Sequence, residues 1–527
     1  MKRIITFLLL AILANVFIYS AIAQPGIEWQ KSLGGEEAVS INLTKSGGYI
    51  VAGNSWGYSF DSSLCGKLDS NAAWAAKLDR NGSTIWKRCF ATKRQDGATS
   101  IIQTKDGSFI FCGWTNGVTS EGAIYHGNYD AWVVKLDSLG TIQWQYTYGG
   151  SNYDYANSII QTYDGGYAFA GWTWSTDGDV TGNHGADDEW VVKLNSIGKI
   201  EWQKCLGGSN YDYASSIIQT PDSGLVITGT TSSNDGNAKG NHGYKDMWIV
   251  KLKADTSIAW QRCAGGAGDD QGTAVCRTND GSYLSVGISQ SYFLNDNYHG
   301  GDDFYCVKLN DSGKILSQSC YGGSQDDQAL AAAPTNDGGY IIVGQTTSSD
   351  GDVGRLRAIY SDIWVVKCDF LGNLEWQKPV GGKSDELAFS VIQSSDGGYV
   401  FTGETASSDG DVTTNYHGAG AWISWIVRLS DNASVSAPKS IDNSDLKILP
   451  DPSSSELNIF YTTTSAVHAQ LSVYDLLGNC LASMDDNNTS IGRRQMKFDA
   501  SKFPQGMYIL RLQSGILNTT GKFTIVR

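Results

Sequence analysis

Short runs of apolar and β-branched residues, separated by Gly, Asn, Asp and Ser, recur along the chain from Ile27 to Leu429. Within one repeat unit this pattern predicts four strands: Ala156–Thr162, Gly165–Gly171, Glu189–Leu194 and Ile200–Leu206. The turn-forming segments Tyr163-Asp164 and Asn195-Ser-Ile-Gly198 join them in pairs, and no unit has a helical apolar period. Each unit is therefore predicted to be a four-stranded antiparallel sheet.

The unit is repeated seven times, at spacings of 57 to 59 residues. The motif I-x-W-Q-K carries its aromatic residue at Trp29, Trp86, Trp144, Trp202, Trp260 and Trp376, with Ser317 in the remaining copy. The motif W-V-V-K-L carries Trp74, Trp132, Trp190, Trp248, Trp364 and Trp425, with Tyr305 once. Seven copies of four strands predict an all-β, seven-bladed β-propeller. A β-solenoid is the alternative, although solenoid repeats are usually shorter and lack tight hairpins.

The frame of the repeat predicts how the ring is completed. Ile27–Leu33 has the sequence of a fourth strand and precedes any complete unit, whereas the last unit ends at Trp425–Leu429 without one. An open ring would expose a strand edge. We therefore expect the N-terminal strand to close the propeller beside Trp425–Leu429, with the Trp columns packed between blades. The motif V-V-K-L-D-x-x-G-x-I-x-W resembles the tryptophan-docking motif of quinoprotein-type propellers, and it implies the same docking role.

The first 23 residues have the parts of a secretory signal peptide: Met1-Lys-Arg, an apolar run, and the small-x-small site that ends at Ala23. An uncleaved anchor helix is the alternative, but the apolar run is short for a bilayer. The mature propeller is predicted to span 24–429. Export permits disulfides, yet most of the ten Cys occupy repeat or strand positions and are interpreted as small buried hydrophobes. One or two bridges remain open, and their connectivity cannot be derived.

After Leu429 the repeat stops. Residues 430–445 are polar and are predicted to be a linker. From Leu446 to Arg527 a new alternating pattern predicts a small β-sandwich, with strands at Leu457–Tyr461, Gln470–Tyr474, Met496–Phe498, Met507–Leu512 and Gly521–Val526.

Motifs in this C-terminal module resemble the type A C-terminal sorting domain of type IX secretion, found in Bacteroidota. The matching positions are Pro450, Pro452, Tyr474, Asp475, Gly478, Pro504, Gly506 and Tyr508. The resemblance implies passage through the periplasm and export across the outer membrane by the type IX secretion machinery. It also implies removal of the domain, followed by release or attachment to surface lipopolysaccharide. The repeats themselves resemble propeller repeats of uncharacterised surface proteins from the same bacteria.

Composition and motifs argue against some classes of binding partner and function. The net charge of −15 argues against nucleic acid, whose binding needs clustered Lys and Arg. Glycine is abundant, with 62 residues, as expected for a turn-rich β protein. No H-E-x-x-H motif is present, no His is paired uniquely with a Ser or Cys, and the arginines are scattered, so a propeller hydrolase is the least favoured function.

The long loops between second and third strands share one face of the predicted propeller, where function normally resides. His126, His184, His242, His299 and His417 in these loops each precede Gly, usually with Asp a few residues beyond. Equivalent positions on separate blades do not converge on one ion, so a hydrogen bond that ties each loop to its blade is favoured over a metal site. Asp177-Gly-Asp179, Asp350-Gly-Asp352 and Asp409-Gly-Asp411 could hold Ca²⁺, although Asp-Gly is foremost a turn dipeptide.

Aromatic residues that break the repeat are the candidates for ligand binding. Trp114 and Trp172 begin their long loops at equivalent positions on adjacent blades, near Tyr153, Tyr155, Tyr211 and Tyr213. Two neighbouring indoles could form a stacking platform for sugar rings, or could simply pack the loops onto their blades. The sequence thus predicts a non-catalytic binding or adhesion protein for glycan or protein, with a structural surface component as the alternative.

Overall fold

The computed structural model describes residues 24–35, 37–56, 65, 70–92, 94–117, 125–292, 298–354, 356, 358, 360–415, 420–430, 446–449, 456–463, 469–475, 480–486, 492–514 and 517–526. The regular elements of these segments are β-strands, and none of the segments forms a helix long and apolar enough to cross a membrane. The predicted signal peptide with its cleavage site at Ala23, and nearly all of the predicted linker, lie outside them.

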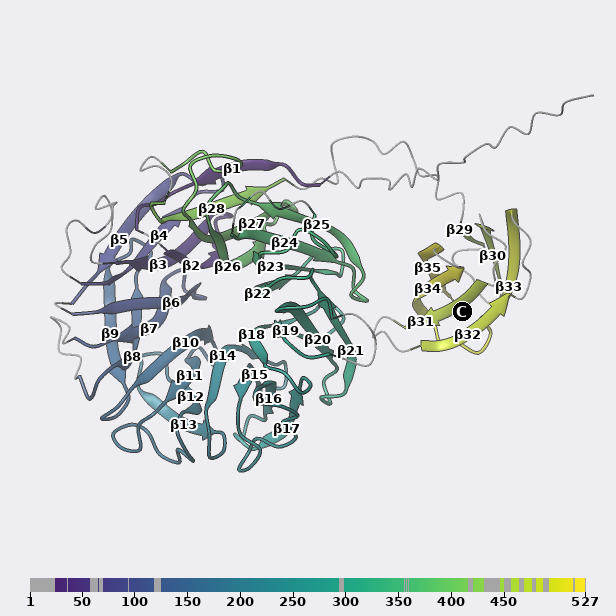
Figure 1. Ribbon diagram of the computed structural model, residues 1–527. Helices are drawn as coiled ribbons and strands as arrows, with labels where there is room; N and C mark the ends of the chain where they lie inside the picture. Colours follow the sequence, from purple (N-terminus) through teal and green to yellow (C-terminus); the bar gives the residue numbers. More distant parts are fainter. Residues whose placement is uncertain are drawn as a thin grey trace, which may run out of the picture.

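Strands β2 to β25 form six antiparallel sheets, each built from four consecutive strands. Figure 1 shows these sheets following one another around a ring. The first three contain β2 (Glu37–Leu43), β3 (Tyr49–Ser55), β4 (Ala72–Leu78), β5 (Thr84–Phe90), β6 (Asp96–Gln103), β7 (Phe109–Thr115), β8 (Asp130–Leu136), β9 (Ile142–Tyr148), β10 (Asp154–Gln161), β11 (Tyr167–Thr173), β12 (Asp188–Leu194) and β13 (Ile200–Leu206). The next three contain β14 (Asp212–Gln219), β15 (Leu225–Thr231), β16 (Asp246–Leu252), β17 (Ile258–Ala264), β18 (Asp270–Arg277), β19 (Tyr283–Ser289), β20 (Asp303–Leu309), β21 (Ile315–Tyr321), β22 (Asp327–Pro334), β23 (Tyr340–Thr346), β24 (Asp362–Cys368) and β25 (Leu374–Val380).

The seventh sheet joins the two ends of the repeat region. It contains β26 (Glu386–Gln393), β27 (Tyr399–Thr405), β28 (Ile423–Leu429) and, beside β28, the N-terminal strand β1 (Ile27–Lys31). Gln30 accepts a hydrogen bond from the indole of Trp425 at 3.1 Å, and Arg428 Nε donates to Glu28 at 2.6 Å. The strand therefore occupies the place that the repeat frame predicts. Seven four-stranded sheets in a ring make this part of the chain a β-propeller.

Buried tryptophans explain the repeat motifs. The third-strand Trp packs between neighbouring sheets: Trp190 shares a buried cluster with Ile110 and Val133 of the preceding sheet. Its indole N–H donates to the Gln that follows the fourth-strand Trp, in the pairs Trp132–Gln145 (3.2 Å), Trp190–Gln203 (2.9 Å), Trp248–Gln261 (2.8 Å) and Trp364–Gln377 (2.9 Å). A buried indole N–H needs an acceptor, and this need accounts for Gln in the motif.

The first sheet departs from this rule. Lys87 occupies the position that Gln takes elsewhere, opposite Ala76 in the β4–β5 register. Trp74 is fully buried there, and its Nε1 has no hydrogen-bond partner within the described part of the chain.

One disulfide joins Cys65 to Cys89. This is within the one or two bridges that the sequence left open, and Cys89 is paired because its repeat position faces a Cys in the preceding long loop. Cys112, Cys306 and Cys368 are free thiols buried in strands, as the sequence predicts.

The C-terminal module has two sheets, ordered β29-β30-β33 and β32-β31-β34-β35. Their strands are β29 (Leu446–Leu449), β30 (Glu456–Thr463), β31 (Ala469–Tyr474), β32 (Cys480–Asp486), β33 (Gly492–Asp499), β34 (Gly506–Ser514) and β35 (Leu517–Ile525). Leu457 and Phe498 of one sheet share a core with Leu471, Leu510 and Phe523 of the other, which makes the module a β-sandwich. Sequence patterns missed β29 and β32.

Candidate functional site

The predicted aromatic candidates meet at one edge of the second to fourth sheets. Trp114 and Trp172 stand next to last in β7 and β11, the second strands of their sheets. Tyr155 lies opposite Trp172 in the antiparallel register. Gly97 lies opposite Trp114, and a Cβ built at Gly97 would come within 2.5 Å of the indole. The absence of a side chain at Gly97 therefore lets the Trp114 ring lie over the first strand.

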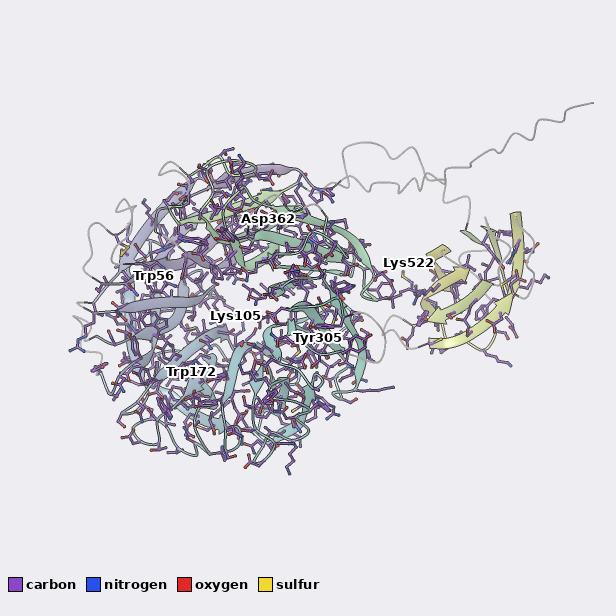
Figure 2. The ribbon with its side chains drawn as sticks, in the orientation of Figure 1. Trp56, Lys105, Trp172, Tyr305, Asp362 and Lys522 are labelled. Carbon is purple, nitrogen blue, oxygen red and sulfur yellow. A yellow bond between two sulfur atoms is a disulfide. The ribbon has the colours of Figure 1, made fainter. Side chains whose placement is uncertain are left out.

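Tyr155 lies between the two indoles. Its ring is stacked on Trp172, with centroids 4.4 Å apart and planes at 14°, and it lies 6.0 Å from Trp114. Trp172 makes an edge contact at 5.7 Å with Tyr213 of the next sheet, which stacks on Tyr211 at 6.3 Å. The five rings thus connect three sheets. Figure 2 labels Trp172 within this part of the ring.

Tyr129 extends the same group and was missed from the sequence. Its ring contacts Trp114 at 5.3 Å, Tyr153 at 5.6 Å and Tyr155 at 5.7 Å. Tyr153 in turn stacks on Trp174 at 5.9 Å. The signal was available, because five of the other six copies have Asn, Asp, Lys or Ser where Tyr129 stands, and the last has Trp422. We call this group the aromatic cluster; its members are Trp114, Tyr129, Tyr153, Tyr155, Trp172, Trp174, Tyr211 and Tyr213.

The cluster has a packed interior and an exposed rim. Trp114, Tyr155 and Trp172 are half-buried, whereas Trp174 is 48% exposed and Tyr211 is 51% exposed. Burial raises the pKa of Tyr155 above its usual value, so its hydroxyl stays protonated. Trp114 and Trp172 are thus partly covered by the rings around them, the most exposed rings are those at the rim, and the stacking platform stays a prediction.

A carboxyl group lies next to the cluster but out of reach of solvent. Glu189 is opposite Trp172 on β12 and is fully buried. Neither of its carboxyl oxygens has a hydrogen-bond partner among the described residues. Burial raises the pKa of Glu189 well above its usual range, and the nearby Asp212 and Asp188 raise it further, which favours the protonated form of the carboxyl group. Full burial separates it from a ligand on the rim.

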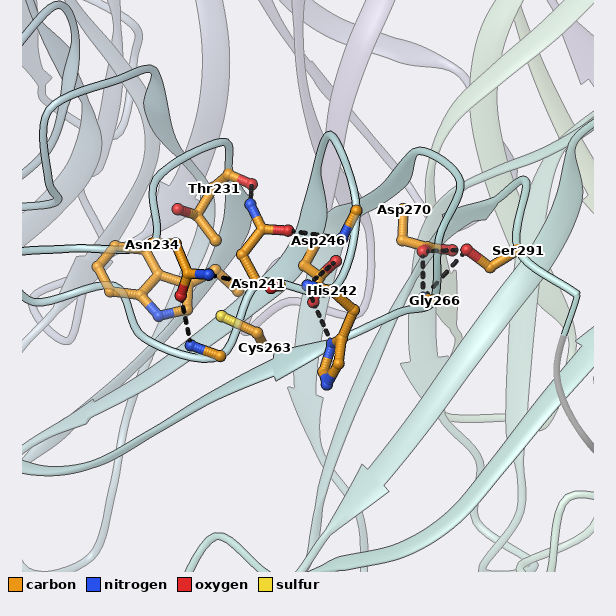
Figure 3. A network of polar contacts seen from close by, with 12 residues as sticks. Thr231, Asn234, Asn241, His242, Asp246, Cys263, Gly266, Asp270 and Ser291 are labelled. Atoms are coloured by element: carbon orange, nitrogen blue, oxygen red, sulfur yellow. Dashed lines mark hydrogen bonds and ion pairs between the residues drawn. The ribbon is translucent and has the colours of Figure 1, made fainter.

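The repeated His residues tie the long loops to their sheets. His184 Nδ1 and His242 Nδ1 lie 2.5 Å and 2.6 Å from the carboxylates of Asp188 and Asp246, the first residues of β12 and β16. His126 and His299 are within 3.3 Å and 3.1 Å of Asp130 and Asp303. The partner is the Asp four residues beyond the His in each case, and Figure 3 shows the His242–Asp246 pair. His417 lies outside the described residues.

In six of the seven repeats, a second buried carboxylate fixes the turn before the first strand. Asp270 accepts hydrogen bonds from Gly266 N at 2.8 Å and from Ser291 Oγ at 2.6 Å (Figure 3). The first Asp of the Asp-Gly-Asp segments forms hydrogen bonds with the same kind of turn. Asp177 accepts from Ser151 N and Asp350 accepts from Ser324 N, both at 2.7 Å. Within the described residues no group of three or more His, Cys, Asp or Glu is placed to hold a metal ion. Calcium binding at these segments stays a prediction.

In the C-terminal sandwich, Tyr508 is buried and its hydroxyl donates to the Pro504 carbonyl at 2.7 Å, across the turn that contains Gly506. Tyr474 ends β31 and Asp475 follows it, whereas Pro450, Pro452 and Gly478 lie outside the described residues. Residues 447–526 match the family model of the secretion system C-terminal sorting domain. This segment is a type IX sorting domain. It marks the protein for export to the cell surface or outer membrane.

Among curated proteins, none matches the sequence. Solved structures with some similarity include PorZ, a surface component of the type IX secretion system of Porphyromonas gingivalis, at 10% identity and a TM-score of 0.32, covering 94% of this chain and 75% of that one. A luciferin-regenerating enzyme has 9% identity, a TM-score of 0.34, and coverage of 76% and 94%. A glycoside hydrolase family 32 protein from Bifidobacterium adolescentis has 12% identity, a TM-score of 0.27, and coverage of 96% and 78%. Scores this low carry no argument about activity.

Proposed function

We propose that the protein is a non-catalytic surface protein that binds glycan through the aromatic cluster. The observation that carries this proposal is the continuous contact of eight rings across three sheets, with Trp174 and Tyr211 exposed at its rim. Aromatic faces stack on the apolar faces of sugar rings, and neighbouring polar groups orient the hydroxyls. Asn152, whose amide donates to the Trp174 carbonyl at 3.4 Å, supplies such a group.

The proposal also covers three other partners: a protein ligand, the secretion machinery and lipopolysaccharide. A protein ligand would use the same exposed rings, since aromatic residues are enriched at the centres of protein interfaces. The sorting domain supports an encounter with the type IX machinery during export. Attachment to lipopolysaccharide after loss of the domain rests on the resemblance alone.

The test is a glycan and polysaccharide array probed with the purified protein, followed by affinity measurements on the glycans that bind. Trp174→Ala removes an exposed ring, and we expect it to weaken binding without lowering the melting temperature. Trp56→Ala is the matched control, because Trp56 is 41% exposed at the same repeat position of the first sheet, away from the cluster. Equal loss from both variants, or an array without binders, would refute the proposal in favour of a structural component. Release of reducing sugar from an array member would indicate a hydrolase.

A further inference from the structure

The sheets meet at the long-loop edge through a backbone contact that is repeated around the ring. In six of the seven sheets, the residue just before the third strand accepts a hydrogen bond from the first residue of the next sheet. The bonds include Asp154 N to Tyr129 O, Asp212 N to Asp187 O and Asp270 N to Lys245 O, each 2.8 Å, and Glu386 N to Ser361 O, 3.1 Å. This contact brings the residue before the third strand close to the residue that precedes the first strand of the next sheet. We call these two residues, such as Tyr129 and Tyr153, a boundary pair.

The backbone contact is the same at each boundary pair, but the side chains of the pair differ from one copy of the repeat to the next. The pairs are Asn71–Gln95, Tyr129–Tyr153, Asp187–Tyr211, Lys245–Asp269, Asp302–Asp326 and Ser361–Asp385. The adjoining residues, such as Asp154 and Asp270, are fully buried and nearly invariant among the copies. A rigid frame that presents variable side chains at fixed positions is the arrangement that binding loops use. Asp187, Asp302 and Ser361 are buried, so the pairs in which both side chains can reach a ligand are Asn71–Gln95, Tyr129–Tyr153 and Lys245–Asp269.

One boundary pair borders a hollow. Lys245 and Asp269 form an ion pair with 3.7 Å between Lys Nζ and Asp Oδ2, and both side chains are partly exposed. The hollow has a volume of about 670 Å³, and its lining includes Asn210, Ser232, Tyr244, Lys245, Asp269 and Gln290. Tyr244 is 81% exposed, so most of its ring is open to solvent.

The hollow adjoins the aromatic cluster. Asn210 precedes Tyr211 of the cluster, and Ser232 N donates to the Tyr211 carbonyl at 2.8 Å. The backbone of Tyr211 is therefore flanked by Asn210 and Ser232 of the hollow's lining, while its ring belongs to the cluster.

We infer that the hollow is a second sugar subsite and that the ligand is an extended, uncharged oligosaccharide spanning the cluster and the hollow. This inference rests on the proposed function. Tyr244 would stack on one sugar ring, while the amides of Asn210 and Gln290 and the Lys245–Asp269 pair would bind hydroxyls. The ion pair is neutral as a unit, and the protein carries a net charge of −15, which repels polyanionic chains.

Oligosaccharides of different lengths distinguish binding at the hollow from binding at the aromatic cluster. We would measure affinities by calorimetry for cello-, xylo-, manno- and malto-oligosaccharides from disaccharide to octasaccharide. Tyr244→Ala should weaken binding of the long oligomers by up to about tenfold and leave the shortest binding oligomer unchanged. Trp174→Ala should weaken both. Tyr360→Ala, at the same repeat position before Ser361 and 64% exposed, should change neither.

The outcomes distinguish this inference from the proposed function. If Tyr244→Ala binds every length as the parent does while Trp174→Ala loses binding, the second subsite is refuted and the function stands. If oligogalacturonates bind as tightly as neutral chains, the uncharged class is refuted. If no oligosaccharide binds and the array is also empty, both proposals fail.

Discussion

The hydrogen bond between a buried indole and the motif Gln can be tested with one substitution. Gln145 accepts from Trp132 Nε1 at 3.2 Å, and Trp132 is 2% exposed. Gln145→Leu keeps the size of the side chain and removes the acceptor, so the indole N–H is left buried and unpaired. Leaving such a group unsatisfied costs about 1–3 kcal/mol.

The expected shift in melting temperature follows from the size of the ring. Unfolding entropy is about 2.1 cal/mol/K per residue, so a propeller of this length loses about 1 °C for each kcal/mol. Gln145→Leu should therefore lower the melting temperature by about 1–3 °C in calorimetry of the full chain.

The first sheet provides a control in the same fold. Lys87→Leu makes a similar change at the equivalent position, where Trp74 Nε1 already lacks an acceptor among the described residues, and should have a smaller effect. Lys87→Gln should supply the acceptor and raise the melting temperature by about 1 °C. Equal losses from Gln145→Leu and Lys87→Leu would show that the indole bond contributes nothing.

Three further predictions concern the ends of the chain and its pH response. Deletion of Ile27–Leu33 removes buried Leu33 and the Gln30–Trp425 and Glu28–Arg428 contacts. The propeller should lose several kcal/mol of stability as a result. An unchanged melting temperature would contradict this prediction. Removal of Leu446–Arg527 should leave a folded propeller in the periplasm, which cell fractionation would show; surface display would refute the export role. Burial raises the pKa of Asp130 and Asp303 to about 6, above the unfolded value of about 3.9, so these groups should make stability fall as pH rises from about 4 to about 6. Asp303→Asn should flatten that fall, and a parent melting temperature that rises across this window would contradict the linkage.

The strands of the propeller were predictable because hairpin turns and apolar runs recur in seven copies. The offset of the repeat also predicted the partner of Ile27–Lys31. In the C-terminal module the same reasoning failed at Cys480–Asp486, where the half-buried stripe consists of Ala482, Met484 and Asp486 and is only weakly apolar. Leu446–Leu449 was missed because it is short and follows a polar segment.

The site was predictable only in part. Trp114 and Trp172 break the repeat and were identified for that reason, but the position of Tyr155 between them depends on how neighbouring sheets pack. Tyr129 contacts residues of the following sheet more than twenty positions away. The disulfide partner Cys65 lies outside the repeated columns, so no pattern linked it to Cys89.

The distribution of exposed aromatic residues favours a binding role for the long-loop edge over an inert one. Both edges of the ring consist of turns, and the hairpin edge repeats the sequence Thr-x-Asp-x-Gly with little change. Among the described residues of the propeller, exposed Trp and Tyr side chains lie at the long-loop edge, at Trp56, Trp174, Tyr211, Tyr244, Tyr292, Tyr360 and Trp422, whereas Tyr163 lies at the hairpin edge. Exposed aromatic rings promote association and are not needed to form a turn. These rings lie at positions where the copies of the repeat differ, and the buried carboxylates that hold the loops are shared by the copies. This distribution is expected if the long-loop edge contacts a ligand.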